Sequence, residues 1–458
     1  MAKKVAGRGG DASPKEVPGR WYSRLSLRPL TQLGPFLTAV DDYVRERRAS
    51  AGGAPVLRAH PGLRSVLLTD HVSGSFFVAA DEALLDREPL PRFGPVATQS
   101  QLTGGCAAAL ISHGAAHRRA RAFAAAVLRE RRQAWRPALE DTLEAALREW
   151  RGRGRVALDD ALQRTLSRFA FRWILDVAPD DADVRAWQEN ITTLVTDSYL
   201  ANAVLRRKLP PLPEAAVRAA GRLVEAVRGS PHLDRLTELG RESDVAGDEL
   251  AQQLVFLCAF NIGGGISRFM TPSLLRVAVQ PGLRDRLRDA LAGWSWDDDG
   301  ARPLVDAVLL ESLRLFPQPR FLHRRAARDF VLPSAAGPYR VRRGDLLVAL
   351  MPMIHRDPAV FADAERFAPQ RFLDDPDLGA RVLTFGWSPD ARHEFHCLGR
   401  VAAQAVWRRV AARLFTGFTW YTPALDFEVN HLRDVDPVDV VLEDFRALPP
   451  RGAASPTR

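Results

Sequence analysis

Residues 385–404, FGWSPDARHEFHCLGRVAAQ, place a cysteine in a loop that leads directly into a helix. The thiolate of Cys397 would face the unpaired N–H groups of the first helical turn, which stabilise negative charge on sulfur. Gly399 lets the backbone approach a bulky group closely. A thiolate held in this way can ligate haem iron. On this segment alone, a structural buried cysteine is an equally good interpretation.

Two earlier segments favour the ligand interpretation. In VLLESLRLFP, residues 308–317, Glu311 and Arg314 are three residues apart and share one helix face. FAPQRF, residues 367–372, adds Arg371 in a stretch that reads as irregular. A buried carboxylate shared by two guanidinium groups would make a rigid polar clamp. Each piece alone is typical of a surface ion pair, so the inference depends on their order ahead of the cysteine loop.

The composition is that of an ordinary globular protein with a large core: 458 residues, 46% apolar and 26% charged. Three cysteines, Cys106, Cys258 and Cys397, cannot form a disulfide framework. The polar opening predicts a disordered arm over residues 1–20 and not a secretory signal. The most apolar stretch, residues 250–266, includes two Gln, one Asn and three Gly, so we expect no membrane span and a cytoplasmic protein.

The net charge of +9 comes almost entirely from arginine, since only four lysines occur. The arginines are dispersed beside Asp and Glu along helical stretches, which is typical of a solvated helix surface. We therefore expect no nucleic-acid partner. A positive field would favour anionic small molecules such as fatty acids.

Hydrophobic periodicity predicts a mainly α protein, with a large helical body and a small β-rich annex. No linker or repeat divides residues 21–458, so we expect a single domain there. The predicted strands are 65–70, 74–79, several short ones within 330–351, and a strand-rich C-terminal tail. The predicted helices are 35–50, 117–150 with a break at Pro137, 160–177, 215–230, 303–316 and 399–415.

These motifs together resemble the cytochromes P-450 over nearly the whole chain. ESLR resembles the family's E-x-x-R motif, FAPQRF its meander, and CLGRVAAQ its haem loop and following helix. The resemblance implies the cytochrome P-450 fold, haem b as cofactor, Cys397 as the iron ligand, and Glu311, Arg314 and Arg371 as a structural triad. HGAAHRRARAF, residues 113–123, resembles the helix that holds a haem propionate. The propionate-binding residues implied by the resemblance are His117, Arg121 and Arg324.

The central segment departs from the pattern of an oxygen-activating member. No Asp or Glu occurs between Glu249 and Asp285, so the acid of the usual proton relay is missing. Ser267 is near the position of the relay alcohol, and a shift of one residue in the alignment would place Ile266 or Arg268 there. Asn261 instead precedes three glycines, each of which costs about 1 kcal/mol relative to Ala in a helix interior. They indicate close approach of a ligand or haem, or else a kink with a satisfied Asn.

The cysteine loop departs from the pattern as well. It is longer than usual between Phe385 and Cys397, and Phe395 stands where a propionate-binding residue is expected. Arg392 or His393 would take that role.

Both departures resemble one branch, the allene oxide synthases, hydroperoxide lyases and epoxyalcohol synthases. FNIGGG, residues 260–265, resembles its central-helix pattern. RFGPVATQSQLTGG, residues 92–105, resembles its loop, with Phe93 ahead of a Leu-Thr-Gly-Gly run. The arginine-rich chain without a transit peptide reads as a bacterial member.

This branch implies an enzyme that rearranges or dehydrates polyunsaturated fatty acid hydroperoxides without dioxygen or a reductase. Asn261 would orient the peroxide over the iron, because its amide both donates and accepts hydrogen bonds. Phe93 would line an apolar cavity beside the acyl chain. One alternative is a monooxygenase or peroxygenase of natural-product metabolism, marked by a working oxygen relay. The other is a non-catalytic haem-fold module, which the intact Cys397 disfavours.

Overall fold

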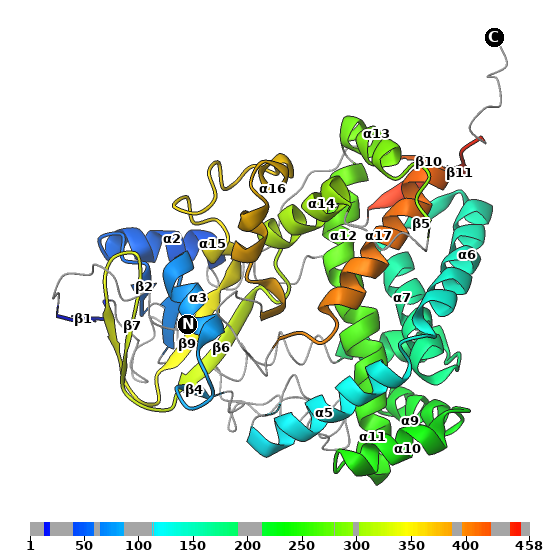
Figure 1. Cartoon of the computed structure of the whole chain (residues 1–458), viewed down its shortest axis with the longest axis horizontal. Coiled ribbons are helices and arrows are strands. Elements are labelled where there is room, and N and C mark those ends of the chain that lie inside the picture. The colour runs from blue at the N-terminus through cyan, green and yellow to red at the C-terminus, as the bar shows by residue number, and fades with distance from the viewer. Residues whose placement is uncertain are drawn as a thin grey trace.

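A helical body stands beside a smaller region built of strands (Figure 1). The structure is a computed structural model of the chain, and it describes residues 13–18, 40–58, 65–86, 112, 114–190, 213–278, 280–295, 302–386, 396–422 and 440–449. The predicted fold class, mainly α with a β-rich annex, is confirmed.

The helical body is formed mostly by residues 114–315 and 400–417. The helices in the described residues are α2 Val40–Ser50, α3 His71–Ala79, α5 Gly114–Glu130, α6 Trp135–Arg153, α7 Leu158–Leu175, a helical stretch at 181–190, α9 Glu214–Arg228, α10 Leu233–Glu242, α11 Gly247–Val255, the π-helical η2 Phe256–Gly264, α12 Gly265–Ala278, α13 Pro281–Ala290, α14 Pro303–Leu315, α15 Met351–Ile354, α16 Gln370–Asp374, η3 Pro376–Arg381, η4 Thr384–Gly386 and α17 Arg400–Gly417.

The strands form three small sheets. Their bounds are β1 Lys15–Glu16, β2 Val56–Leu57, β3 Ser65–Leu68, β4 Leu85–Asp86, β5 Arg155–Ala157, β6 Phe321–Ala326, β7 Phe330–Leu332, β8 Tyr339–Val341, β9 Leu346–Leu350, β10 Phe418–Tyr421 and β11 Val441–Ala447. The largest sheet has the order β2-β3-β9-β6-β4, with β3 parallel to β9 and β6 antiparallel to β9. The other two have the orders β1-β8-β7 and β10-β11-β5.

Two hydrophobic cores hold these parts together. The larger joins α5, α6, α7, α9 to α14 and α17, and it buries Phe169 and Trp407 completely. The smaller lies between α3 and the largest sheet, around Phe77, Val66 and Leu347. Each helix gives the core an apolar stripe at three- and four-residue spacing, as α9 does with buried residues at 216, 219, 220, 223, 224 and 227.

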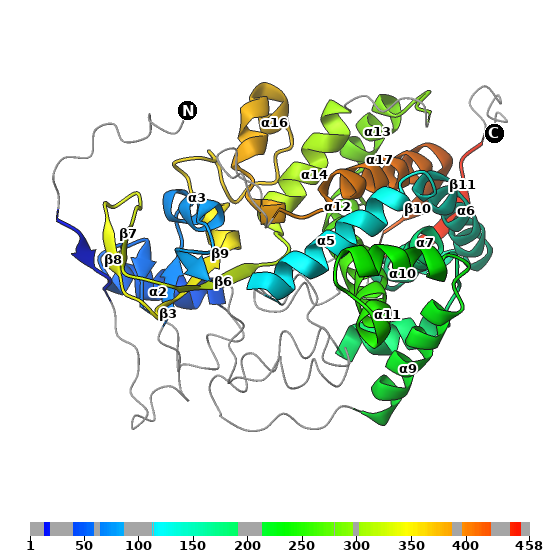
Figure 2. The same cartoon turned by 60° about the horizontal axis from the view of Figure 1, so that its bottom comes forward.

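The central helix is continuous from Gly247 to Ala278, since α11, η2 and α12 follow one another without a break. Figure 2 shows it inside the helical body, with α5 and α17 nearby. It is long and apolar enough to cross a membrane, with a mean hydropathy of 1.4 over its most apolar window. However, 78% of that window is buried inside the protein, as expected of a core helix.

Residues 74–79 are helical, so the strand predicted there is wrong. Asp70 begins α3 as its N-cap, with the carboxylate accepting from the Ser73 N–H at 3.3 Å. The buried residues His71, Gly74, Phe77 and Val78 then follow helical spacing. The aromatic and β-branched composition favoured a strand, but the cap and the helical burial pattern prevail over that propensity.

Two other predictions need correction. The helix break predicted at Pro137 lies at residues 131–134, between α5 and α6. Pro137 stands in the first turn of α6, where a backbone N–H would have no partner within the helix, so proline is tolerated there.

Residues 13–18 are also ordered within the arm predicted to be disordered. β1 pairs in parallel with β8, and the Lys15 ammonium donates to the Ala336 carbonyl at 2.7 Å. The rest of residues 1–20 lies outside the described residues.

Candidate functional site

The cysteine loop is closed at its base by a backbone hydrogen bond. The Cys397 N–H donates to the Phe385 carbonyl at 2.9 Å, which joins the two described ends of this segment. Phe385 has a φ of 68° and turns the chain at this point. Its ring packs edge-on against Phe269 of α12, with the centroids 6.0 Å apart. The Phe385 end of the segment thereby packs against the central helix.

The Cys397 sulfur lies where α17 begins, with Gly399 as the N-cap residue. Its side chain is exposed, and the backbone N–H groups of Gly399 and Arg400 donate to the sulfur. Surrounding protein raises the pKa of the thiol, whereas the two N–H donors and the Arg121 charge lower it. The sulfur is therefore accessible to a ligand, and its charged form is stabilised by named groups.

Cys258 is a different kind of cysteine. It is fully buried in η2, and burial alone raises the pKa of its thiol. It fills the core and offers no ligand position. Cys106 lies outside the described residues.

Helix α5 brings a cation to the cysteine loop. The Arg121 guanidinium donates to the His396 carbonyl at 2.6 Å, directly before Cys397. His117 lies one turn earlier on the same helix face, and its side chain is buried. The structure thus places both residues predicted on α5 as neighbours, one of them at the cysteine loop. Their contact with a haem propionate stays a prediction.

Arg324 has protein partners of its own. Its guanidinium donates to the carbonyls of Phe77 at 3.1 Å, Ala80 at 2.7 Å and Asp81 at 3.2 Å, at the C-terminal end of α3. Burial lowers the pKa of Arg324 to about 10. The structure therefore gives this arginine the role of a helix cap, and its predicted propionate contact stays a prediction.

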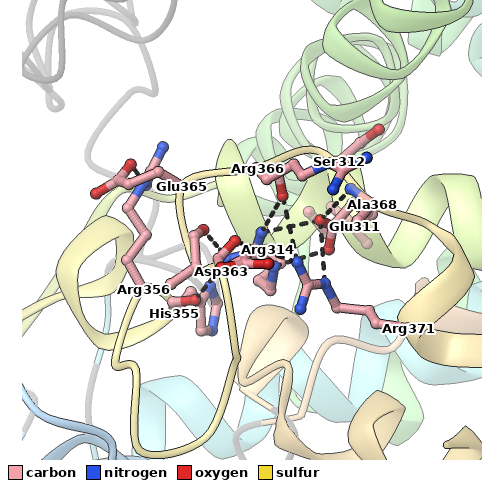
Figure 3. Close-up of polar contacts among 12 residues, drawn as sticks. Glu311, Ser312, Arg314, His355, Arg356, Asp363, Glu365, Arg366, Ala368 and Arg371 are labelled. Atoms are coloured by element: carbon pink, nitrogen blue, oxygen red, sulfur yellow. Dashed lines mark hydrogen bonds and ion pairs between the residues drawn. The ribbon is translucent and has the colours of Figure 1, made fainter.

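The predicted clamp is present and buried (Figure 3). The Glu311 carboxylate lies 2.7 Å from Arg314 Nε and 3.3 Å from Arg371 Nε, and it also accepts from the Ala368 N–H at 2.7 Å. Glu311 and Arg314 are both completely buried. Arg371 belongs to the short helix α16, although its segment was expected to be irregular.

His355 joins this clamp to the cysteine loop. Its carbonyl accepts from Arg314 Nη1 at 3.0 Å, and its ring Nε2 accepts from the Leu383 N–H at 3.0 Å, two residues before Phe385. Burial is the largest of several effects that lower the pKa of His355 to about 3, so the ring stays neutral and can accept. Sequence reasoning missed this residue, because nothing in HRDP marks the histidine as buried.

The central helix widens into a π turn at the position of Asn261. η2 runs from Phe256 to Gly264 and includes the asparagine and two of the three glycines. The Asn261 side chain is exposed and makes no hydrogen bond within the described ranges. Single π turns inside α-helices occur frequently at functional sites. The Asn261 amide is therefore not satisfied as a kink would require, but the close approach at Gly263 is that of α7, since a Cβ there would lie 2.6 Å from Ser167 Oγ.

The hydroxyl groups that follow are already bonded. Ser267 Oγ donates to the Gly264 carbonyl at 3.0 Å, and Thr271 Oγ1 donates to Asp159 of α7 at 2.8 Å. Ser267 is therefore held by its own helix. Together with the missing acid, this arrangement lacks the usual oxygen relay.

Several predicted positions lie outside the described residues: Phe93, the Leu102–Gly105 run, Arg392, His393 and Phe395. Their roles stay predictions.

The described residues fit a haem bound through sulfur. A haem-thiolate site needs an accessible cysteine, donors that stabilise the thiolate, and cations for the propionates. Cys397, the Gly399 and Arg400 N–H groups, and Arg121 supply these features from two helices.

Comparisons with known proteins agree with this geometry. The cytochrome P-450 family model matches residues 278–430. An epoxyalcohol synthase of Ectocarpus siliculosus is 29% identical over 400 residues, covering 81% of this chain and 83% of the relative. A mitochondrial hydroperoxide bicyclase of Plasmodiophora brassicae is 29% identical over 383 residues, covering 80% and 69%. An allene oxide synthase of Oryza sativa is 30% identical over 242 residues, covering 49% and 45%.

The fold is also that of a solved structure. A cyanobacterial cytochrome P-450 with bound retinoic acid superposes with a TM-score of 0.68 at 18% identity, covering 90% of this chain and 96% of the other. The cysteine loop, the buried clamp and these matches lead to one conclusion: the chain has the fold of the cytochromes P-450, and it is similar to members of that family named for hydroperoxide chemistry, among them an epoxyalcohol synthase and a hydroperoxide bicyclase.

Proposed function

We propose that this protein rearranges or dehydrates polyunsaturated fatty acid hydroperoxides at a haem b, without dioxygen and without a redox partner. The central observation is the exposed Asn261 amide on the π turn, in a helix that has no acid after Glu249 and whose Ser267 hydroxyl is already bonded. The relatives support the substrate class, since they include an epoxyalcohol synthase, a hydroperoxide bicyclase and an allene oxide synthase.

When bound, haem with a thiolate ligand supplies homolytic cleavage of the substrate's O–O bond. Cys397 would hold the iron, and Arg121 with His117 would hold a propionate. Asn261 would donate from its amide nitrogen to one peroxide oxygen and accept at its carbonyl oxygen. This contact orients the hydroperoxide without removing a proton, so it is a positioning effect. The substrate radical can then cyclise onto its own neighbouring double bond.

The test is rapid mixing of the ferric protein with linoleic acid hydroperoxide in the absence of any reductase. We expect loss of the conjugated-diene absorbance over many turnovers per haem. Asn261→Ala should slow this loss by about a hundredfold, the scale of effect for a misplaced reactant. Asn190→Ala is the matched control, because the Asn190 amide only donates to the Ala186 carbonyl of its own helix.

Product analysis completes this experiment. Allene oxide hydrolysis products or epoxyalcohols would identify the rearrangement. Bleaching of the haem without turnover would contradict the proposal. Turnover that starts only when a ferredoxin-type donor is added would establish the monooxygenase alternative.

A further inference from the structure

The buried side-chain amide of Gln188 contacts the π turn η2 on the side that faces the core. Gln188, in the helical stretch 181–190, is 3% exposed. Its Nε2 donates to the Ala259 carbonyl at 2.6 Å and to Ser167 Oγ at 2.9 Å. Gln163 of α7 donates to Gln188 Oε1 at 3.0 Å, which fixes the orientation of the amide group. Both ends of the Gln188 amide are therefore engaged.

The Ala259 carbonyl has a partner outside its own helix. In a π turn each carbonyl pairs with the N–H five residues on, and the second lone pair of the carbonyl oxygen can accept from a further donor. Ala259 is completely buried, so water is not its partner. The Gln188 amide supplies a short hydrogen bond at this position. It therefore ties the π turn to the helical stretch 181–190.

Gly263 lets α7 approach the same turn. A Cβ at this position would lie 2.6 Å from Ser167 Oγ and 2.9 Å from Ser167 Cα. A side chain would force η2 and α7 apart and would separate Ser167 from Gln188. The glycine thus explains how Ser167 and the Ala259 carbonyl can reach one amide.

Asn261 lies on the other face of this segment. Positions two residues apart on a helix point in nearly opposite directions, so Ala259 faces the core when Asn261 faces outward. Burial agrees, since Ala259 is buried and Asn261 is exposed. Aromatic rings brace the same inner face: Trp187 packs on Phe256 at 5.9 Å, and Phe256 packs on Phe260 at 4.9 Å.

We propose that Gln188 is a positioning residue for the reaction, which acts through Asn261 by holding the π turn at Ala259 and Ser167. The inference rests on the proposed function, because it assigns Asn261 to the hydroperoxide. Gln188 itself does not touch the substrate. Its removal should misplace the Asn261 amide while the cysteine loop and the clamp remain in place.

The test compares Gln188→Met with Gln252→Met in the haem-loaded enzyme. Gln252 is a half-buried glutamine of α11, and its side chain makes no hydrogen bond within the described ranges. We expect Gln188→Met to lower kcat by about tenfold with little change in KM, as the loss of an orienting contact predicts. Gln252→Met should behave as the wild type.

Two further readouts separate positioning from stability. The double variant Gln188→Met with Asn261→Ala should be no slower than Asn261→Ala alone, since residues that act in series are not additive. Binding of the hydroxy acid that corresponds to the hydroperoxide, followed by the shift of the haem absorbance, should stay close to the wild-type value in Gln188→Met, because the loss falls on orientation and not on affinity. Full additivity in the double variant, or a lower Tm with unchanged kcat, would overturn the proposal.

The remaining outcomes are also decisive. If Gln188→Met does not fold, Ser167→Ala removes one of the two acceptors and should lower kcat by about threefold in the same way. A wild-type enzyme that leaves the hydroperoxide intact contradicts the proposed function.

The claim that Gln188 holds the π turn is then tested by amide hydrogen exchange over residues 256–264. Faster exchange in Gln188→Met than in the wild type supports this claim, and unchanged exchange overturns it.

Discussion

The sulfur of Cys397 differs from that of Cys258 in what surrounds it. Cys397 is accessible and receives two backbone N–H groups, whereas Cys258 is sealed in the core. Cys397→Ala should therefore abolish the haem-thiolate spectrum of the purified protein. Cys258→Ala should retain it at wild-type haem content. Electron paramagnetic resonance of the ferric protein measures the difference, and a thiolate signal in Cys397→Ala would refute the ligand assignment.

The Arg121 charge lowers the pKa of the Cys397 thiol. Removing this charge makes the thiolate less stable, so its pKa rises and protonation begins at higher pH. In an acid titration followed by the haem absorbance, Arg121→Met should lose the thiolate spectrum at a higher pH than the wild type. Arg119→Met is the control, since Arg119 pairs with Asp244 on the surface at 2.9 Å. A midpoint for Arg121→Met at or below the wild-type value would contradict the assignment.

At the scale of elements, the clamp ties α14 and α16 to the base of the cysteine loop. Arg371→Met removes one charged partner of the buried Glu311, at a cost of about 1.5–3 kcal/mol in the free energy of unfolding. Urea denaturation of the haem-loaded protein measures this loss. Arg218→Met, which breaks the exposed pair of Arg218 with Glu214 on α9, should leave the midpoint unchanged. Equal effects of the two variants would show that the clamp is not a structural tie.

The close contact between α7 and η2 gives a second prediction at this scale. Gly263→Ala places a Cβ against Ser167 and should cost about 1–3 kcal/mol, as overpacking does. Gly282→Ala in α13 meets nothing within 4 Å and should stabilise the protein by about 0.5–1 kcal/mol. Thermal unfolding compares the two variants. Stabilisation by both would mean that the two helices are not in tight contact.

Sequence reasoning succeeded where function follows from local spacing. Glu311 and Arg314 are three residues apart, and Cys397 directly precedes a helix, so one turn of chain defines each feature. It failed where tertiary contact decides. The bond between Gln188 and Ala259 joins residues 71 positions apart, and nothing local to either residue predicts the π turn. The bonds of Arg324 to the carbonyls of Phe77 and Ala80 depend on tertiary contact in the same way, whereas its propionate contact stays a prediction from the motif.

At the scale of the whole molecule, the helical body and the β-rich part meet around the cysteine loop. The loop is held by Phe269 of the central helix, by Arg121 of α5 and by His355 beside the clamp. The arginines of the helical surface are largely paired with acids, as Arg172 is with Asp141 and Arg185 with Asp160.

The measurement that bears most directly on the central claim is turnover of linoleic acid hydroperoxide, labelled with heavy oxygen at the peroxide, under nitrogen and without any reductant. Because Asn261 replaces an oxygen relay, we predict the same rate as in air, with the label retained in the epoxide or its hydrolysis product. A reaction that stops without dioxygen and an electron donor, or a product whose new oxygen comes from air, would contradict the account.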